Sequence, residues 1–425
     1  MNQNLSRPRI HRDRRANLIA SLFAAGALVG TAAPAHASFY QLTDLVTDDQ
    51  AFLTGLGFPA ATHVDANLIN PWGVSHSSTS PFWVSDNGAG VATLYTGTGA
   101  PLSLVVTIAP PASPPPGFTN STPTGQVRNP GAVPSGFNVT KGANTGPSSF
   151  IFATEDGTIS GWNPAVDATN SIIAVDKSKI PTAATGAVYK GLAIAPDGSL
   201  LYAANFRAGT VEVYDSTFTL KNTITDPTVP AGYAPFNVQV LNGKLYVSFA
   251  LQDAAKHDDV SGAGNGFVDV FNLDGTGMQR LISQGVLDSP WGLDIAPSSF
   301  GAFANDLLVG NFGSDPGTNS INVFNPNTGA FLGTLTDASG NPIEIEGLWA
   351  LANGNGGPAP NGSDLNAVYF TAGIGDEMHG LFGELTAVPE PGSLALLATG
   401  LAGLMWFRRR RGGVETVPVE RGSAA

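Results

Sequence analysis

The chain has 425 residues, of which 52 are Gly and 31 are Pro, and only 12% of its residues are charged. This composition is atypical of a helical enzyme and favours short strands joined by many turns, while the 42% hydrophobic content argues against global disorder. The formal net charge of −13 disfavours nucleic acid as a partner, and the absence of Cys excludes disulfides and thiol-based sites.

The first 37 residues have the pattern of an export signal. Five Arg residues precede the apolar stretch 18–33, and the small residues Ala35 and Ala37 follow it. We therefore expect a signal peptide that directs the chain to the secretion translocon and is cleaved after Ala37. A permanent membrane helix is the alternative, but 16 apolar residues fall short of the roughly 20 that span a bilayer. A twin-arginine signal at Arg14 and Arg15 is disfavoured because Asp13 precedes the pair.

Between residues 38 and 388 the sequence repeats a pattern of four short strands. An opening segment beside a Pro or Gly recurs at 70–76, 189–198, 234–243, 289–297 and 346–354, and residues 148–176 fit strands two to four of one further unit. Alternating apolar residues such as Val211 and Val213 have the two-residue period of strands. Six such units predict an all-β, six-bladed β-propeller, with seven blades as the alternative count. A pair of β-sandwiches would not explain the repeated order.

Two segments of the body depart from the repeat. Residues 39–46 precede the first full unit, and we expect them to close the ring beside 380–388, because closure removes open sheet edges. Residues 107–147 form an insertion rich in Pro, Gly, Ser and Thr, read as a long connector or as a lid over one face. Within it, 136–140 (GFNVT) is a candidate for the first strand of the second blade.

In a propeller, the ends of the second strands converge on one end of the central channel. The polar residues at or near these positions are the candidate channel or metal ligands: Asp86, Asn87, Glu155, Asp156, Asn205, Asn311, Asp376, Glu377 and His379. Glu346, the first residue of the opening segment 346–354, is a further candidate. Carboxylates and amides are hard oxygen donors, which suits Ca²⁺ or Mg²⁺. Asp and Asn are also ordinary turn formers, so a structural role is the alternative for each residue.

The blade rhythm resembles that of NHL-type and gluconolactonase-type six-bladed propellers. The second resemblance implies a metal-dependent lactonase or esterase, in which a cation polarises a carbonyl and activates water. The opening motif of gluconolactonases has one imperfect counterpart, Glu346-Gly347-Leu348-Trp349, which lies in the last unit and lacks the Pro. No catalytic residue is therefore assigned from this motif.

The C-terminal segment combines three features in order. Pro389-Glu390-Pro391 is followed by the uncharged stretch 392–407 and then by Arg408, Arg409, Arg410 and Arg411. This set closely resembles a PEP-CTERM protein-sorting tail, which implies a short membrane helix over 389–411, recognition by an exosortase-type peptidase, and release or attachment at the cell surface. Residues 412–425 are expected to be a disordered extension. A C-terminal membrane anchor without processing is the alternative.

The sequence leaves two hypotheses for the function of the protein. Between the two ends, residues 38–391 carry ten Lys and Arg against thirty Asp and Glu, an acidity that favours neutral or basic partners. The favoured hypothesis is a non-enzymatic binding or structural module of the cell envelope or extracellular matrix, with a glycan, peptide or protein ligand. The alternative is a divalent-metal-dependent hydrolase with its site at the channel mouth.

Overall fold

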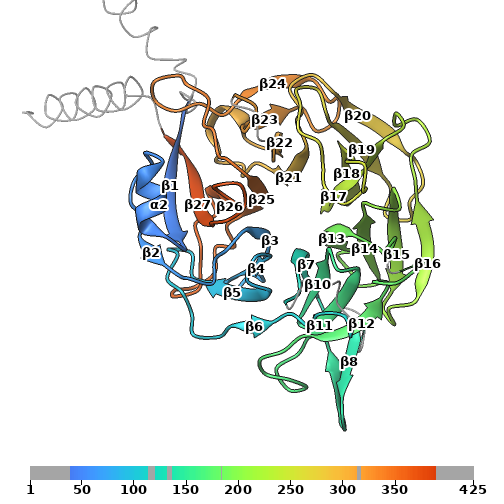
Figure 1. The fold of residues 1–425 in the computed structure, drawn as a ribbon. Coiled ribbons are helices and arrows are strands. Elements are labelled where there is room, and N and C mark those ends of the chain that lie inside the picture. Colours follow the sequence, from blue (N-terminus) through green and yellow to red (C-terminus); the bar gives the residue numbers. More distant parts are fainter. Residues whose placement is uncertain (1–38, 113–119, 132–135, 183, 314–316, 389–425) are drawn as a thin grey trace, which may run out of the picture. The chain divides into compact units, whose positions relative to one another are not determined.

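The computed structural model describes residues 39–112, 120–131, 136–182, 184–313 and 317–388. The expected signal peptide 1–37 and the segments 389–411 and 412–425 lie outside these residues. Six sheets surround a central axis (Figure 1), so the expected six-bladed β-propeller is confirmed. No helix in the described part of the chain is both long enough and apolar enough to cross a bilayer.

Five of the blades are four-stranded antiparallel sheets. Blade one consists of β3 (Pro71–Ser75), β4 (Phe82–Asp86), β5 (Val91–Tyr95) and β6 (Val106–Thr107). Blade two consists of β7 (Pro123–Arg128), β10 (Phe150–Thr154), β11 (Thr158–Trp162) and β12 (Ile172–Asp176). Blade three consists of β13 (Tyr189–Ile194), β14 (Leu200–Asn205), β15 (Thr210–Asp215) and β16 (Leu220–Ile224). Blade four consists of β17 (Tyr233–Leu241), β18 (Lys244–Leu251), β19 (Phe267–Phe271) and β20 (Gln279–Ser283). Blade five consists of β21 (Pro290–Ile295), β22 (Leu307–Asn311), β23 (Ile321–Phe324) and β24 (Phe331–Thr334).

Blade six joins the two ends of the described chain. Its strands are β25 (Leu348–Asn353), β26 (Ala367–Ala372), β27 (Leu381–Val388) and β1 (Phe39–Thr47), and β2 (His63–Val64) pairs in parallel with β1. β1 pairs antiparallel with β27, and the register places Phe39 opposite Val388. The expected closure of the ring by 39–46 is therefore confirmed.

The blades pack face to face through apolar side chains that alternate along the strands. Between blades three and four, Tyr202 and Val213 pack in one buried cluster with Val238 and Val247. The second strands β4 and β10 are buried along their whole length because each lies between two partner strands inside the ring. Burial of aromatic and β-branched side chains of this kind is the main stabilising contribution to a fold without disulfides.

Residues 138–147 of the insertion form a hairpin outside the blades. β8 (Asn138–Lys141) pairs only with β9 (Asn144–Pro147), and the first strand of blade two is β7, which pairs with β10. The assignment of 136–140 to the first strand of this blade was therefore wrong. Among the described residues, the two helical elements are α2 (Gln50–Gly55), whose N-terminus is capped by Asp49, and the short 3₁₀ helix η1 (Gly301–Phe303).

Candidate functional site

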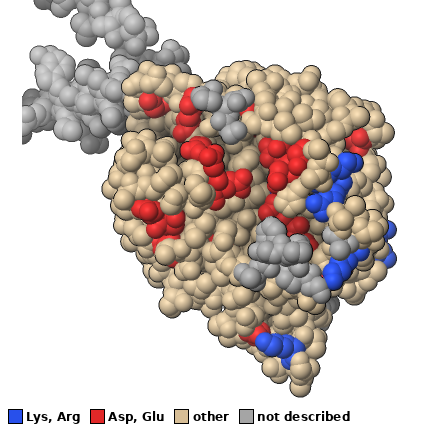
Figure 2. Space-filling view, in the orientation of Figure 1, with Lys and Arg blue, Asp and Glu red and all other residues tan. Residues whose placement is uncertain are grey.

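One end of the central channel is formed where the first strands begin and the second strands end. We call this end the mouth. It consists of Asn70, Asn87, Glu155, Lys190 and the loop residues 257–259 and 373–380. Figure 2 shows Asp and Glu side chains gathered around the middle of one face of the propeller.

The centre of the mouth is a buried lysine between carboxylates. The Lys190 side chain is 2% exposed, and its Nζ lies 2.5 Å from Oε1 of Glu155 and 3.3 Å from Oδ1 of Asp258. The amide of Asn87 donates to the other oxygen of Glu155 at 2.9 Å, and Nδ1 of His257 lies 2.8 Å from Oδ1 of Asp258. This network joins residues of blades one, two, three and four at the axis.

A second polar group borders the mouth from blade six. The amide of Asn70 donates to Glu377 at 2.6 Å and accepts from the indole Nε1 of Trp349 at 2.9 Å. The loop 373–380 that carries Glu377 is held by Glu346, which accepts from the backbone N–H groups of Gly375 and Asp376. Glu377 has a φ of 64°, a left-handed conformation that is uncommon for Glu and is often associated with functional loops.

Burial and mutual repulsion perturb the acids of the mouth. Burial, with repulsion from Glu155, raises the pKa of Glu377 to about 7. Burial raises the pKa of Asp259 to about 6, whereas His257 and Lys190 hold the pKa of Asp258 well below its ordinary value. The mouth therefore contains ionised carboxylates together with the carboxyl of Glu377, which is partly protonated near neutral pH, so it can both accept from and donate to hydroxyl groups.

An aromatic cluster fills the channel beneath the mouth. The indole ring of Trp72 stacks on that of Trp349 with centroids 3.4 Å apart, and Trp349 stacks on Phe312 at 3.8 Å. Nζ of Lys190 lies 4.9 Å from the centroid of Trp72, within the range of a cation–π contact. The cluster thus gives the mouth a closed floor and supports the lysine from below.

The structure places the predicted site residues in several environments. Asn87, Glu155 and Glu377 lie at the mouth, and Glu346 and Asp376 shape the loop that carries Glu377. His379 pairs with Asp48 and stacks on Phe52.

The other four predicted residues have structural partners or are enclosed. Asp156 accepts from Ser121 and Thr122, Asn205 bonds to Glu212, and Asn311 donates to the carbonyls of Val286 and Thr318. Asp86 is fully buried at the end of β4, and burial raises the pKa of its carboxyl well above the ordinary value.

Sequence reasoning missed Asn70, Lys190, His257 and Asp258. Lys190 lies in one of the opening segments, which the sequence pattern identifies only as a strand. A Lys within an apolar strand is itself a signal, because Lys is rarely buried without a partner and the body contains few basic residues. His257 and Asp258 lie in the loop after β18, whose contact with blade three cannot be seen in the sequence.

The mouth does not fit the hard-cation site that the gluconolactonase resemblance implies. One oxygen or nitrogen atom from each of Glu155, His257 and Asp258 lies within 4.8 Å of the others. However, the ammonium of Lys190 already contacts both carboxylates, so a divalent cation placed there would face a fixed positive charge. The position of a Ca²⁺ or Mg²⁺ ion is thus taken by a side chain.

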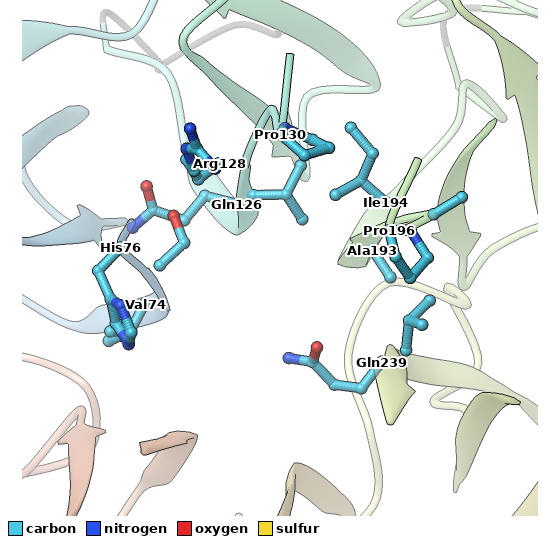
Figure 3. A pocket seen from close by; sticks show the side chains of 13 residues that line it. Val74, His76, Gln126, Arg128, Pro130, Ala193, Ile194, Pro196 and Gln239 are labelled. Carbon is cyan, nitrogen blue, oxygen red and sulfur yellow. The ribbon is translucent and has the colours of Figure 1, made fainter. Parts of the chain in front are cut away.

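The opposite end of the channel opens into two adjoining cavities of about 290 and 390 Å³ that share Val74, His76 and Gln239. Figure 3 shows the first cavity, with Gln126 and Arg128 on its wall. The Gln126 amide nitrogen donates to the backbone carbonyls of Gly73 and Trp83, so this side chain ties blades one and two together.

Comparison with known proteins identifies the tail. Residues 387–411 match the model of the PEP-CTERM protein-sorting motif. This confirms the resemblance drawn from Pro389–Pro391 and the Arg cluster. A motif of this kind implies export, sorting to the surface and processing by an exosortase.

The body is similar in sequence to proteins of Acanthamoeba polyphaga mimivirus. "Uncharacterized protein R648" is 32% identical over 335 residues, covering 76% of this chain and 76% of the viral protein. "Uncharacterized protein L690" is 32% identical over 335 residues, covering 76% of this chain and 82% of its own length.

Among solved structures, a virginiamycin B lyase from Staphylococcus aureus aligns with a TM-score of 0.43 and 12% identity, over 75% of this chain and 80% of the lyase. A streptogramin B lyase aligns with a TM-score of 0.43 and 9% identity, over 82% of this chain and 98% of the lyase. These likenesses concern the fold alone, whereas the extent and identity of the viral matches show that this chain belongs to the same family as the two mimivirus proteins.

Proposed function

We propose that this protein is a surface-sorted β-propeller that serves as a binding module of the cell envelope or extracellular matrix. In this proposal the signal peptide 1–37 is removed, 38–388 is the working domain with its insertion at 107–147, and 389–411 is the sorting and anchoring segment. Residues 412–425 are a disordered extension. The secretion translocon and an exosortase-type peptidase are the processing partners, and the ligand is held at the mouth.

The observation that carries the proposal is the environment of Lys190. Its ammonium neutralises Glu155 and Asp258 without a bound cation, and its Nζ lies over the ring of Trp72. Such a mouth offers fixed hydrogen-bonding groups over a closed apolar floor, which suits recognition more than water activation. The neighbouring carboxyl of Glu377, whose pKa is raised to about 7, adds an acid that can donate as well as accept.

The chemistry of the mouth favours a neutral glycan as its ligand. Hydroxyl groups can donate to Glu155 and Asn87 and accept from a protonated Glu377. The thirty acidic residues of the body would repel an anionic polysaccharide. A neutral glycan avoids this repulsion because it carries no charge. Its many hydroxyl groups can form the hydrogen bonds that the mouth offers.

Affinity electrophoresis of residues 38–388 through gels containing a neutral or an acidic polysaccharide tests this proposal. We expect retardation by at least one neutral glycan, lost in Glu377→Ala or Asn87→Ala and kept in Glu384→Gln, whose side chain lies on β27 away from the mouth. If both mouth variants are retarded as strongly as the wild type, or if no neutral glycan retards the protein, the mouth is not a glycan site.

A metal-dependent hydrolase is the second candidate, and one observation favours it. Glu155, His257 and Asp258 form a compact group of potential ligands. For a metal to bind there, the Lys190 ammonium would have to leave both carboxylates or lose its proton. Its pKa is raised by the neighbouring Glu155 and Asp258 despite burial, so loss of the proton is disfavoured.

A further inference from the structure

A separate pocket lies beside the mouth, between the loop that precedes β13 and the loop that follows β18. Its volume is about 540 Å³, which is within the range of small-molecule sites. Its wall includes the apolar side chains of Ile180, Pro181, Ala187 and Ala254, together with Arg207 and Lys256. We call it the arginine pocket.

The guanidinium of Arg207 is incompletely satisfied. Nη1 donates to the backbone carbonyl of Gly186 at 2.8 Å, but Nε is buried and has no acceptor. Within the described residues Arg207 forms no ion pair with a carboxylate, because Asp253 and Asp258 act on it only from a distance. Nη2 is not enclosed and has no hydrogen-bond partner among the described residues, so a ligand in the pocket can supply an acceptor to it.

The positive charge of this pocket contrasts with the rest of the body. Only ten Lys and Arg occur between residues 38 and 391, and five of them form ion pairs with Asp or Glu: Lys141, Lys177, Lys190, Lys221 and Arg280. Arg207 and Lys256 instead share one pocket, and none of its described lining residues carries a carboxylate. The pocket is therefore locally cationic on a strongly acidic domain.

We propose that the arginine pocket binds a small organic acid with one carboxylate and an apolar body. The carboxylate accepts from Nη2 of Arg207, because Nη1 is held by Gly186 and Nε is enclosed, and Lys256 adds a second positive charge. The apolar body lies against Ile180, Pro181 and the alanines. This inference does not depend on the proposed function of the mouth, because Glu155, Asn87 and Glu377 do not line the pocket.

Calorimetric titration of residues 38–388 with three probes tests the proposal, since this segment closes its own ring and contains its own core. The probes are 3-phenylpropionate, its neutral analogue 3-phenylpropanol, and acetate, at about 150 mM salt to screen distant acids. We expect 3-phenylpropionate to bind saturably and at least about ten-fold more tightly than either other probe. Equal binding of the alcohol would overturn the role of Arg207, equal binding of acetate would overturn the apolar contact, and no binding would overturn the site.

Three variants locate the binding. Arg207→Gln keeps a donor for the carbonyl of Gly186 and should weaken 3-phenylpropionate binding about ten-fold or more. Ala255→Glu places a negative charge in the lining at an exposed position, so it should have the same effect without disturbing the fold. Lys244→Gln removes an exposed cation outside the pocket and should change the affinity less than about two-fold. If Arg207→Gln and Ala255→Glu are folded and bind as the wild type does, the proposal is wrong.

Discussion

Lys190 and Glu155 are 35 positions apart in the sequence, yet their side chains meet at 2.5 Å at the mouth. Glu155 follows the second strand of blade two, and Lys190 lies in the first strand of blade three. The pair therefore joins two consecutive blades at the axis, where the strands of a propeller come closest together. Asp258 extends the same network to blade four.

Replacing this lysine should destabilise the domain strongly. In Lys190→Met, Glu155 and Asp258 lose their common counter-charge, and the free energy of unfolding should fall by about 3 kcal/mol. Urea denaturation of residues 38–388 measures the change. Lys221→Met, which removes an exposed partner of Asp215, should cost less than about 1 kcal/mol. Equal losses in the two variants would show that the Lys190 network adds nothing to stability.

Glu377 should make stability depend on pH in the mildly acidic range. Its pKa is raised from 4.5 to about 7, so the folded state binds a proton that the unfolded chain releases between these values. The stability from this group is present below about pH 4.5 and is lost as pH rises toward 7. Asp259, with its pKa raised to about 6, acts in the same direction.

Unfolding in urea at about pH 5 and pH 7.5 checks this expectation. Glu377→Gln should reduce the fall in unfolding free energy between the two values by about 1–2 kcal/mol. Asp197→Asn serves as the control, because hydrogen bonds from Ser199 lower the pKa of this exposed carboxyl and keep it ionised at both values. A wild-type slope in Glu377→Gln would mean that this carboxyl does not take up the proton.

Divalent cations should not stabilise the propeller selectively. After treatment with chelator, addition of Ca²⁺, Mg²⁺, Mn²⁺ or Zn²⁺ should leave the melting temperature unchanged, because Lys190 occupies the space between Glu155 and Asp258. A site filled at 100 times its Kd would add about 2.7 kcal/mol, so calorimetry can detect it. A saturable rise with one ion, absent in Glu155→Gln, would restore the metallohydrolase hypothesis.

Tyr40 should be a sensitive position for ring closure. This residue of β1 is buried, its ring stacks on Phe300 at 4.6 Å, and its hydroxyl donates to the Phe300 carbonyl at 3.1 Å. Tyr40→Phe removes only the hydrogen bond and should cost about 1 kcal/mol. Tyr40→Ala also removes the buried ring and should cost about 3–5 kcal/mol in urea denaturation. Similar losses in the two variants would exclude ring packing as the main contribution of β1.

The fold could be predicted from the sequence because each blade repeats a local pattern. Alternation around Val211 and Val213 and turns such as 196–198 identify strands without any knowledge of their partners. The local pattern did not identify the first strand of blade two, because Pro123–Arg128 contains Pro, Gly and Gln and only two β-branched residues, Thr124 and Val127. Residues 138–141 fit a strand better but pair only with a neighbouring segment.

The site could be predicted only in part, for a different physical reason. Asn87, Glu155 and Glu377 were found because they follow second strands, whose ends must converge in a propeller. Lys190 and Asp258 are 68 positions apart, and their contact depends on the path of the loop after β18. No local pattern encodes that path, so a list of strand ends recovers the acids of the mouth but not the cation that pairs with them.

The strand from which the sorting tail continues is not at an edge of its sheet. β27 ends at Val388 and is hydrogen-bonded on one side to β26 and on the other to β1. When a surface-attached molecule is pulled through its C-terminus, the force enters a strand with two ladders, which must shear together before the strand can move. In a molecule that stays attached through its C-terminus, the load is therefore carried by the same hydrogen bonds that hold the N-terminal strand β1 in its sheet.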